Sequence, residues 1–128
     1  MLSTDLFIPV VAVCAVREAP DHRSEMTSQL LLGEPVQVLD EFKAEWLQVR
    51  SIHDGYEGWC QKIQLAPVND PLPELAGYYS GYLGYANVNG QPITVFSGTP
   101  VYLAEIKAGK TAISFTGLKW NSSAAGPL

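Results

Sequence analysis

The sequence predicts an all-β fold, a small barrel or sandwich built from short strands. β-Branched and aromatic residues gather in short runs, and each run is bounded by Gly, Pro, Asp or Asn. No stretch sustains a helical period. A chain of 128 residues with 47% hydrophobic content is long enough for one compact domain or for two small β units that share an interface.

The first element is a buried strand in an apolar run that begins at Leu6. This run is too short to span a bilayer, and Asp5 precedes it without the positive leader of a signal peptide. The segment "HRSEMTSQL", residues 22–30, is the one expected helical turn, with Ser24 as its cap. In chain order the expected strands are residues 8–16, 29–32, 36–42, 46–53, 56–65, 81–88, 93–96, 101–106 and 112–115.

The segment "APVNDPLPELA" contains three prolines, which remove backbone donors and stiffen the chain, so it is typical of a linker. We therefore predict a first β unit at residues 1–66, a linker at residues 67–76 and a second β unit with a tail at residues 77–128.

The two predicted units share a short pattern. Gly33, Pro35 and Val36 correspond to Gly98, Pro100 and Val101, always 65 residues apart. In each case a turn needs glycine, and proline then enters a strand where no ladder donor is lost. The pattern predicts two similar β units, the second incomplete or more diverged.

Charge argues against two classes of partner. Eight Lys and Arg against thirteen Asp and Glu give a net charge of −5, and no basic run occurs. Because phosphate neutralisation requires clustered Lys and Arg, we expect binding neither to nucleic acid nor to anionic membranes.

The stretch "HDGYEGWCQK" raises the question of a cysteine nucleophile. Asp54-Gly55 predicts a two-residue hairpin turn, which places Cys60 opposite Val49 and about 13 Å along the sheet from His53. A thiol and its base must lie within about 3 Å. A longer loop at the same turn would shift the register without closing this gap. We therefore expect no local dyad, with Cys60 an inert buried residue and His53 an exposed residue beside the turn.

Metal binding is not expected either. Cys14, His22, His53 and Cys60 contain no closely spaced ligand pair of the usual zinc pattern, and the sequence implies no cofactor. A disulfide between Cys14 and Cys60 is left open.

The segment 11–65 resembles a bacterial SH3 domain and, more narrowly, the amino-terminal SH3-like domain of NlpC-type cell-wall peptidases. These are papain-like cysteine hydrolases that cleave γ-D-glutamyl-diamino acid bonds in murein peptides. The matching features are Val16-Arg17 followed by Pro20, "RSE" at 23–25, "QLLLGEPV" at 29–36, Trp46 with "LQVR", and "DGYEGW" at 54–59.

The resemblance implies a small SH3-like barrel followed by a second, smaller SH3-like unit at residues 78–120. In that family a catalytic domain follows, with an Asp-Cys-Ser-Gly-type motif. Neither Cys14, in "AVCAV", nor Cys60, in "GWCQK", lies in such a motif. The resemblance thus implies the non-catalytic front end of such an enzyme or a stand-alone relative, and it leaves open whether a catalytic domain follows residue 128.

In the related enzymes the SH3-like domain helps to select peptides with a free amino-terminal L-alanine, and a tyrosine takes part. Tyr56 is the matching position. Ammonium groups are well held by aromatic faces and carboxylates, which Glu25, Asp54 and Glu57 supply. Alternatively, Tyr56 and Glu57 only decorate a solvent-facing hairpin.

Other aromatic residues have two interpretations. Trp46 and Trp59 either belong to the barrel core or form a shallow groove for peptide or glycan. The segment "GYYSGYLGY", residues 77–85, is either an interface strip or an edge strand.

We therefore expect a non-catalytic module that recognises murein peptide or peptidoglycan. The alternatives are a protein-interaction or dimerisation module, which docks on a peptidase domain in the same or another chain, and an autonomous cysteine enzyme. The protein is expected to be bacterial, with the cytoplasm and the cell envelope left open.

Overall fold

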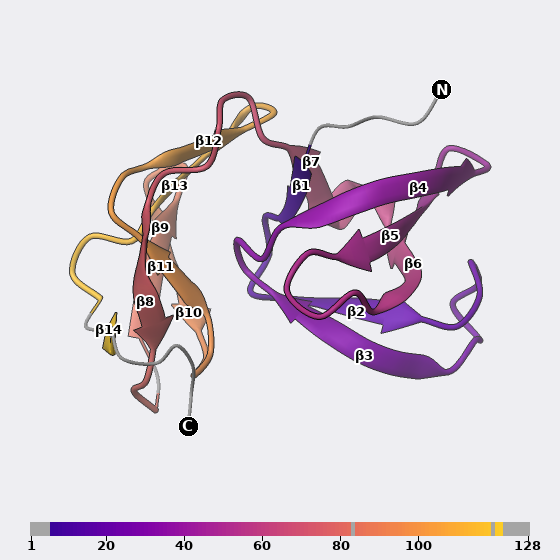
Figure 1. Cartoon of the computed structure of the whole chain (residues 1–128), viewed down its shortest axis with the longest axis horizontal. Coiled ribbons are helices and arrows are strands. Elements are labelled where there is room, and N and C mark those ends of the chain that lie inside the picture. Colours follow the sequence, from indigo (N-terminus) through magenta and orange to yellow (C-terminus); the bar gives the residue numbers. More distant parts are fainter. Residues whose placement is uncertain (1–5, 83, 119, 122–128) are drawn as a thin grey trace.

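The computed structural model describes residues 6–82, 84–118 and 120–121 and confirms the all-β prediction. Figure 1 shows two groups of strands packed side by side. We call β1–β7 the first unit and β8–β14 the second unit. The strands are β1 (Leu6–Pro9), β2 (Val13–Arg17), β3 (Met26–Leu31), β4 (Val36–Phe42), β5 (Trp46–Ser51), β6 (Glu57–Gln61), β7 (Leu65–Pro67), β8 (Leu75–Tyr79), β9 (Gly84–Val88), β10 (Gln91–Val95), β11 (Pro100–Tyr102), β12 (Ile106–Ala108), β13 (Thr111–Ser114) and β14 (Trp120–Asn121).

The first unit is one antiparallel sheet with the strand order β3-β2-β6-β5-β4-β1-β7. It curls around a small core, as expected of an SH3-like fold (Figure 1). A 3₁₀ turn, η1 (Lys62–Gln64), joins β6 to β7. The buried core residues are Cys14, Val16, Leu30, Val36, Leu47, Val49, Cys60 and Leu65. In the described part of the chain, no helix has the length and apolar character required to cross a membrane.

The predicted strand 8–16 is wrong as one element, because the chain bends between Pro9 and Val13. β1 pairs with β4 and β7, whereas β2 pairs with β3 and β6. The bend is held by backbone hydrogen bonds from Leu32 N–H to the Ala12 carbonyl and from Val10 N–H to the Gln64 carbonyl. One apolar run therefore forms two strands, β1 and β2, which are not neighbours in the sheet.

The predicted helical turn in residues 22–30 is also wrong. β3 already begins at Met26. Ser24 accepts a hydrogen bond from the Ala19 N–H at 2.9 Å, and its own N–H donates to the Asp21 carbonyl. The serine thus closes a loop between two strands instead of capping a helix, since such side chains satisfy turns as readily as helix ends.

The β5–β6 hairpin has a longer loop than the two-residue turn predicted from Asp54-Gly55. Ser51 N–H donates to the Tyr56 carbonyl, which leaves 52–55 as the loop, and Gly55 has a φ of +75°. The shifted register places Cys60 opposite Leu47 rather than Val49. Within the loop, the Gly55 N–H donates to the Ser51 carbonyl, which is the hydrogen bond of a single helical turn.

The second unit contains a four-stranded sheet, β10-β9-β13-β12, and a three-stranded sheet, β11-β8-β14. The strands β8 and β14 were not predicted. The predicted strand 101–106 is two strands, because β11 pairs with β8 and β12 pairs with β13. The other predicted strands of this unit are present with shifted ends.

The two Gly-x-Pro-Val segments form the same local turn. Gly33 and Gly98 both have positive φ, +83° and +98°. Glu34 N–H donates to the Leu31 carbonyl, and Thr99 N–H donates to the Phe96 carbonyl, again 65 residues apart. The following strands pair differently, since β4 joins β1 and β5 whereas β11 joins β8. The local turn is thus common to both units, and a full repeat stays a prediction.

The two units share a buried core. Ile8, Leu32 and Ala66 of the first unit belong to the same buried cluster as the second unit's core residues. Where the chain leaves the first unit, Val68 forms an isolated antiparallel β-bridge with Ala108 of the second unit. The Asn69 side-chain amide donates to the Gly109 carbonyl and accepts from the Gly109 N–H. Residues 67–76, assigned to a linker from the sequence, therefore begin and end in paired β structure.

Tyr102 links the units by a hydrogen bond. Its hydroxyl donates to the Gly33 carbonyl at 3.0 Å, and the pair is buried. The Tyr102 ring also packs on Phe115, with 5.5 Å between centroids. This contact fixes the turn of the first unit against the core of the second.

We expect Tyr102→Phe to lower the free energy of unfolding by about 1–3 kcal/mol, because a buried carbonyl at Gly33 loses its donor. Urea unfolding measures this. Tyr82→Phe, at a side chain that is 90% exposed, is the matched control and should change stability little. Equal stability of the two variants would show that the hydroxyl at Tyr102 does not hold the units together.

Candidate ligand site

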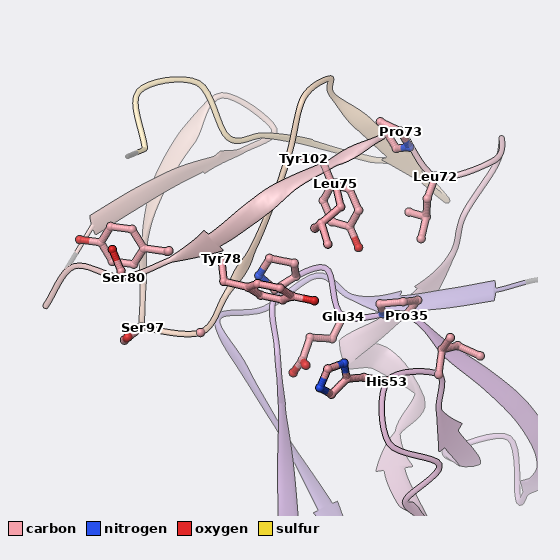
Figure 2. A pocket seen from close by; sticks show the side chains of 14 residues that line it. Glu34, Pro35, His53, Leu72, Pro73, Leu75, Tyr78, Ser80, Ser97 and Tyr102 are labelled. Carbon is pink, nitrogen blue, oxygen red and sulfur yellow. The ribbon is translucent and has the colours of Figure 1, made fainter. Parts of the chain in front are cut away.

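A cleft of about 640 Å³ lies between the two units. Figure 2 shows its walls, with Glu34, Pro35 and His53 on the first unit and Tyr78 reaching toward them from β8 of the second. Most of the lining is apolar, as in typical small-molecule sites. The lining residues are Glu34, Pro35, Ile52, His53, Leu72, Pro73, Leu75, Tyr78, Tyr79, Ser80, Ser97, Gly98, Pro100 and Tyr102.

Glu34 supplies a carboxylate to the floor of this cleft. The turn at Gly33 positions it, and its Oε1 accepts a hydrogen bond from the Leu31 N–H at 2.6 Å. Burial raises the pKa of Glu34 above its ordinary value of 4.5, and the backbone bond and the nearby His53 oppose this rise. No ion pair of the described residues involves this carboxylate. It is therefore suited to a cationic ligand group.

Tyr102 forms part of the wall next to Glu34. Burial raises the pKa of its hydroxyl, and the proximity of Tyr78 and Glu34 adds to the rise. The phenol therefore remains a neutral donor, engaged with Gly33. It shapes the cleft and leaves recognition to other groups.

A smaller notch of about 40 Å³ opens beside the cleft. Glu34 and His53 line both cavities, while Asp54 and Tyr56 line only the notch. Asp54 Oδ1 accepts a hydrogen bond from the Tyr56 N–H at 3.0 Å, which fixes the tip of the hairpin. The volume suits one water molecule or a group of ammonium size. The remaining lining residues are Val16, Ser28, Gln29, Leu30, Val49 and Ser51.

The predicted binding residues are thus divided over the surface. Asp54 and Tyr56 lie together at the notch. Glu57 forms an exposed ion pair with Arg50 at 2.9 Å, and Glu25 is exposed just before β3, outside the notch lining. An ion pair of this kind contributes little to stability, but it does occupy the carboxylate of Glu57.

The two predicted tryptophans lie elsewhere on the barrel. Trp46 is 4% exposed and makes an edge contact with His22 at 4.9 Å. Trp59 is half-buried and contacts Phe42 edge-on at 6.4 Å. Neither lines the cleft or the notch. Trp46 instead borders a separate depression with His22 and Lys62.

Cys14 and Cys60 are both fully buried and unbridged. A side-chain hydrogen bond with Cys14, together with burial, raises the pKa of Cys60, which disfavours the nucleophilic thiolate. Leu47, opposite Cys60, and Ser51 are four residues apart, about 13 Å along the strand, and His53 lies beyond Ser51 in the loop. Among the described residues, no His, Cys, Asp and Glu cluster is arranged to hold a metal ion.

Sequence reasoning missed Glu34 and Tyr78 as site residues. Glu34 was seen only as part of a turn motif, and Tyr78 only as part of a tyrosine-rich strip. His53 was expected beside a turn, and it is exposed there, but it also faces the cleft (Figure 2). The signal in the sequence was the position of Glu34 between Gly33 and Pro35. A turn glycine and a proline restrict the backbone on either side of the acidic residue, and so they restrict the direction of its side chain.

Comparison with known proteins places a domain on part of this chain. Residues 16–65 match the family described as the bacterial dipeptidyl-peptidase Sh3 domain. Over 43 residues the chain is 42% identical to "Dipeptidyl-peptidase 6" of Lysinibacillus sphaericus, a match that covers 34% of this chain and 16% of that protein. The chain therefore shares only a small part of the length of this relative.

The raised pKa of Glu34 predicts a pH dependence of stability. A carboxyl with a higher pKa in the folded state binds protons more tightly there, so folding gains stability as pH falls through that pKa toward 4.5. We expect the wild type to gain stability relative to Glu34→Gln between neutral pH and pH 4.5. Urea unfolding at several pH values measures the difference.

Glu57→Gln is the control for this measurement, because its carboxylate is exposed on the surface. A difference between the wild type and Glu34→Gln that stays constant with pH would contradict a desolvated carboxylate at Glu34.

Proposed function

We propose that this chain is a non-catalytic module that recognises murein peptides. Residues 16–65 form a bacterial SH3 domain of the type found in dipeptidyl-peptidases. The resemblance to the front end of NlpC-type enzymes implies recognition of a free amino-terminal L-alanine. Cys60 and His53 are held well apart along the β5–β6 hairpin, and both cysteines are fully buried, so the proposal is one of binding and not of cysteine catalysis.

The observation that carries the proposal is the meeting of Glu34, Asp54 and Tyr56 at one notch of about 40 Å³. An ammonium group needs a carboxylate and gains from an aromatic face. Glu34 is partly desolvated by its surroundings, which strengthens its attraction to a cation over that of an exposed acid. Glu34 thus takes the role for which the sequence suggested Glu25 or Glu57.

The adjoining cleft gives the rest of the peptide a place to lie. The notch and the cleft meet at Glu34 and His53, so a ligand anchored at its ammonium extends directly between the units. Pro35 and Tyr78 offer apolar contact for the alanine methyl group, and Ser80 and Ser97 offer hydroxyls further along (Figure 2).

We expect L-Ala-γ-D-Glu-diamino acid peptides to bind, as measured by calorimetry. Glu34→Gln should weaken the affinity by roughly tenfold or more, because a charge-assisted contact contributes about 1.5–3 kcal/mol. Tyr56→Ala should weaken it about two- to fivefold, because a cation–π contact at an exposed site contributes about 0.5–1 kcal/mol. Tyr82→Ala, in the second unit, should bind as the wild type does.

A peptide with an acetylated amino terminus is the matched ligand control, since it retains every other group. It should lose most of its affinity. Equal binding of the acetylated and free peptides would contradict recognition of the ammonium group, and absence of binding by both would contradict the proposed function.

A second candidate is a docking module for a separate peptidase domain, and the apolar rim of the cleft favours it. Ile52 and Leu75 line the cleft and are 51% and 41% exposed. Exposed apolar side chains around a groove are typical of contact surfaces.

We expect a purified NlpC-type catalytic domain to form a complex with this chain if docking is the function. Sedimentation velocity measures this, and the double variant Ile52→Ser/Leu75→Ser should abolish the complex because the apolar contact area is lost. Lys43→Ser is the control, because Lys43 lies in the turn between β4 and β5 and does not line the cleft. No complex at high micromolar concentration would count against docking.

A further inference from the structure

We propose that the second unit carries a separate site for a neutral saccharide, in a hollow beside strand β9. The hollow shares only Tyr79 and Ser80 with the cleft and includes neither Glu34 nor Tyr56. The notch proposed for the ammonium group and this hollow share no lining residue, so the inference does not rest on recognition at the notch.

The hollow has a volume of about 640 Å³. This volume can accommodate one or two sugar rings, and the hollow is open to solvent. Its walls come from β8, the turn before β9, β9 itself and the segment that follows β13. The lining residues are Tyr79, Ser80, Gly81, Gly84, Tyr85, Asn87, Thr116, Gly117 and Leu118.

Alternation along β9 places the recognition groups on the outer face. Tyr85 and Asn87 are two residues apart and share one face, while Ala86 between them is fully buried. Tyr85 is 61% exposed although it is a large aromatic residue in a paired strand. The Tyr85 side chain therefore borders the hollow and is accessible for contact.

Two glycines, Gly81 and Gly84, leave space at the base of the hollow. A Cβ at Gly84 would approach Tyr79 Cζ and Leu118 Cδ2 to 2.7 Å, and a Cβ at Gly81 would overlap the Tyr79 hydroxyl. The absence of side chains at these positions lets the hydroxyl end of Tyr79 lie at the base of the hollow. Gly84 begins β9 and Gly81 precedes it, and close approach of another group is a usual reason for glycine at such a position.

The chemistry of the lining fits a sugar better than an ion. None of the described lining residues carries a charge. Ser80 and Thr116 offer hydroxyls, and Asn87 offers an amide with both donors and an acceptor. The Thr116 hydroxyl is held by Ser114 Oγ at 3.0 Å. Hydroxyl groups around a pyranose pair with such groups, while its C–H face packs on an aromatic ring such as Tyr85.

The test is titration of the full chain with chitotetraose and with cellotetraose, followed by calorimetry. These two neutral oligosaccharides distinguish N-acetylated from unsubstituted glucan chains as the source of the sugar. We expect binding of at least one, weakened about five- to tenfold in Tyr85→Ala through loss of the stacking contact. Asn87→Ala, which leaves the ring in place, should also weaken binding.

Tyr82→Ala is the matched control, because Tyr82 is 90% exposed and lies outside the lining. It should bind as the wild type does. Glu34→Gln and Tyr56→Ala should also leave saccharide affinity unchanged, so a failure of peptide recognition and a failure of this inference are distinguishable.

Absence of binding by both oligosaccharides, or equal loss in Tyr85→Ala and Tyr82→Ala, would overturn the inference. Light scattering tests whether a second copy of the chain occupies the hollow. A dimer that Tyr85→Ala converts to a monomer would assign the hollow to a second copy of the chain and would likewise overturn it.

Discussion

The turn from Leu31 to Glu34 is the constraint on which the arrangement of this protein depends. Leu32 enters the core shared with the second unit, and Gly33 adopts a φ of +83° and offers its carbonyl to Tyr102. Glu34 is thereby directed into the cleft. One positive-φ glycine thus couples the packing of the two units to the placement of the carboxylate. A side chain at position 33 would be strained in this conformation whatever space surrounded it.

The cost of this arrangement is a partly buried carboxylate with no ion-pair partner among the described residues. Such a group is unfavourable in the free protein, and a cationic ligand relieves the penalty. The same physics explains why the exposed Glu57, already paired with Arg50, is a weaker candidate. For the proposed recognition of a cation, the position of Glu34 at the junction of notch and cleft therefore favours it over the exposed acidic residues near the hairpin.

The hairpin at residues 52–55 shows how a local signal can be right in kind and wrong in register. Asp54 and Gly55 do lie in a turn, and Asp54 Oδ1 accepts a hydrogen bond from the Tyr56 N–H. The loop is closed, however, by the hydrogen bond from the Ser51 N–H to the Tyr56 carbonyl, so it contains four residues. The shift moved the partner of Cys60 from Val49 to Leu47, which is two residues further along β5 from His53. Cys60 and His53 are therefore too far apart for a dyad with either turn type.

The sequence alone determined the all-β class, the ends of β4, the SH3-like character of the first unit and the isolation of Cys60 from His53. The all-β class, the ends of β4 and the separation of Cys60 from His53 follow from local preferences, because turn residues and alternating apolar residues act within a few positions. The SH3-like character came instead from the resemblance of residues 11–65 to a known family. Only the tertiary structure decided that β1 and β2 separate, that β8 joins the sheet of β11, and that Glu34 meets Tyr56 at one notch. Those outcomes rest on contacts between residues that are distant in the chain. Local sequence patterns do not specify which distant segments pair or in which register.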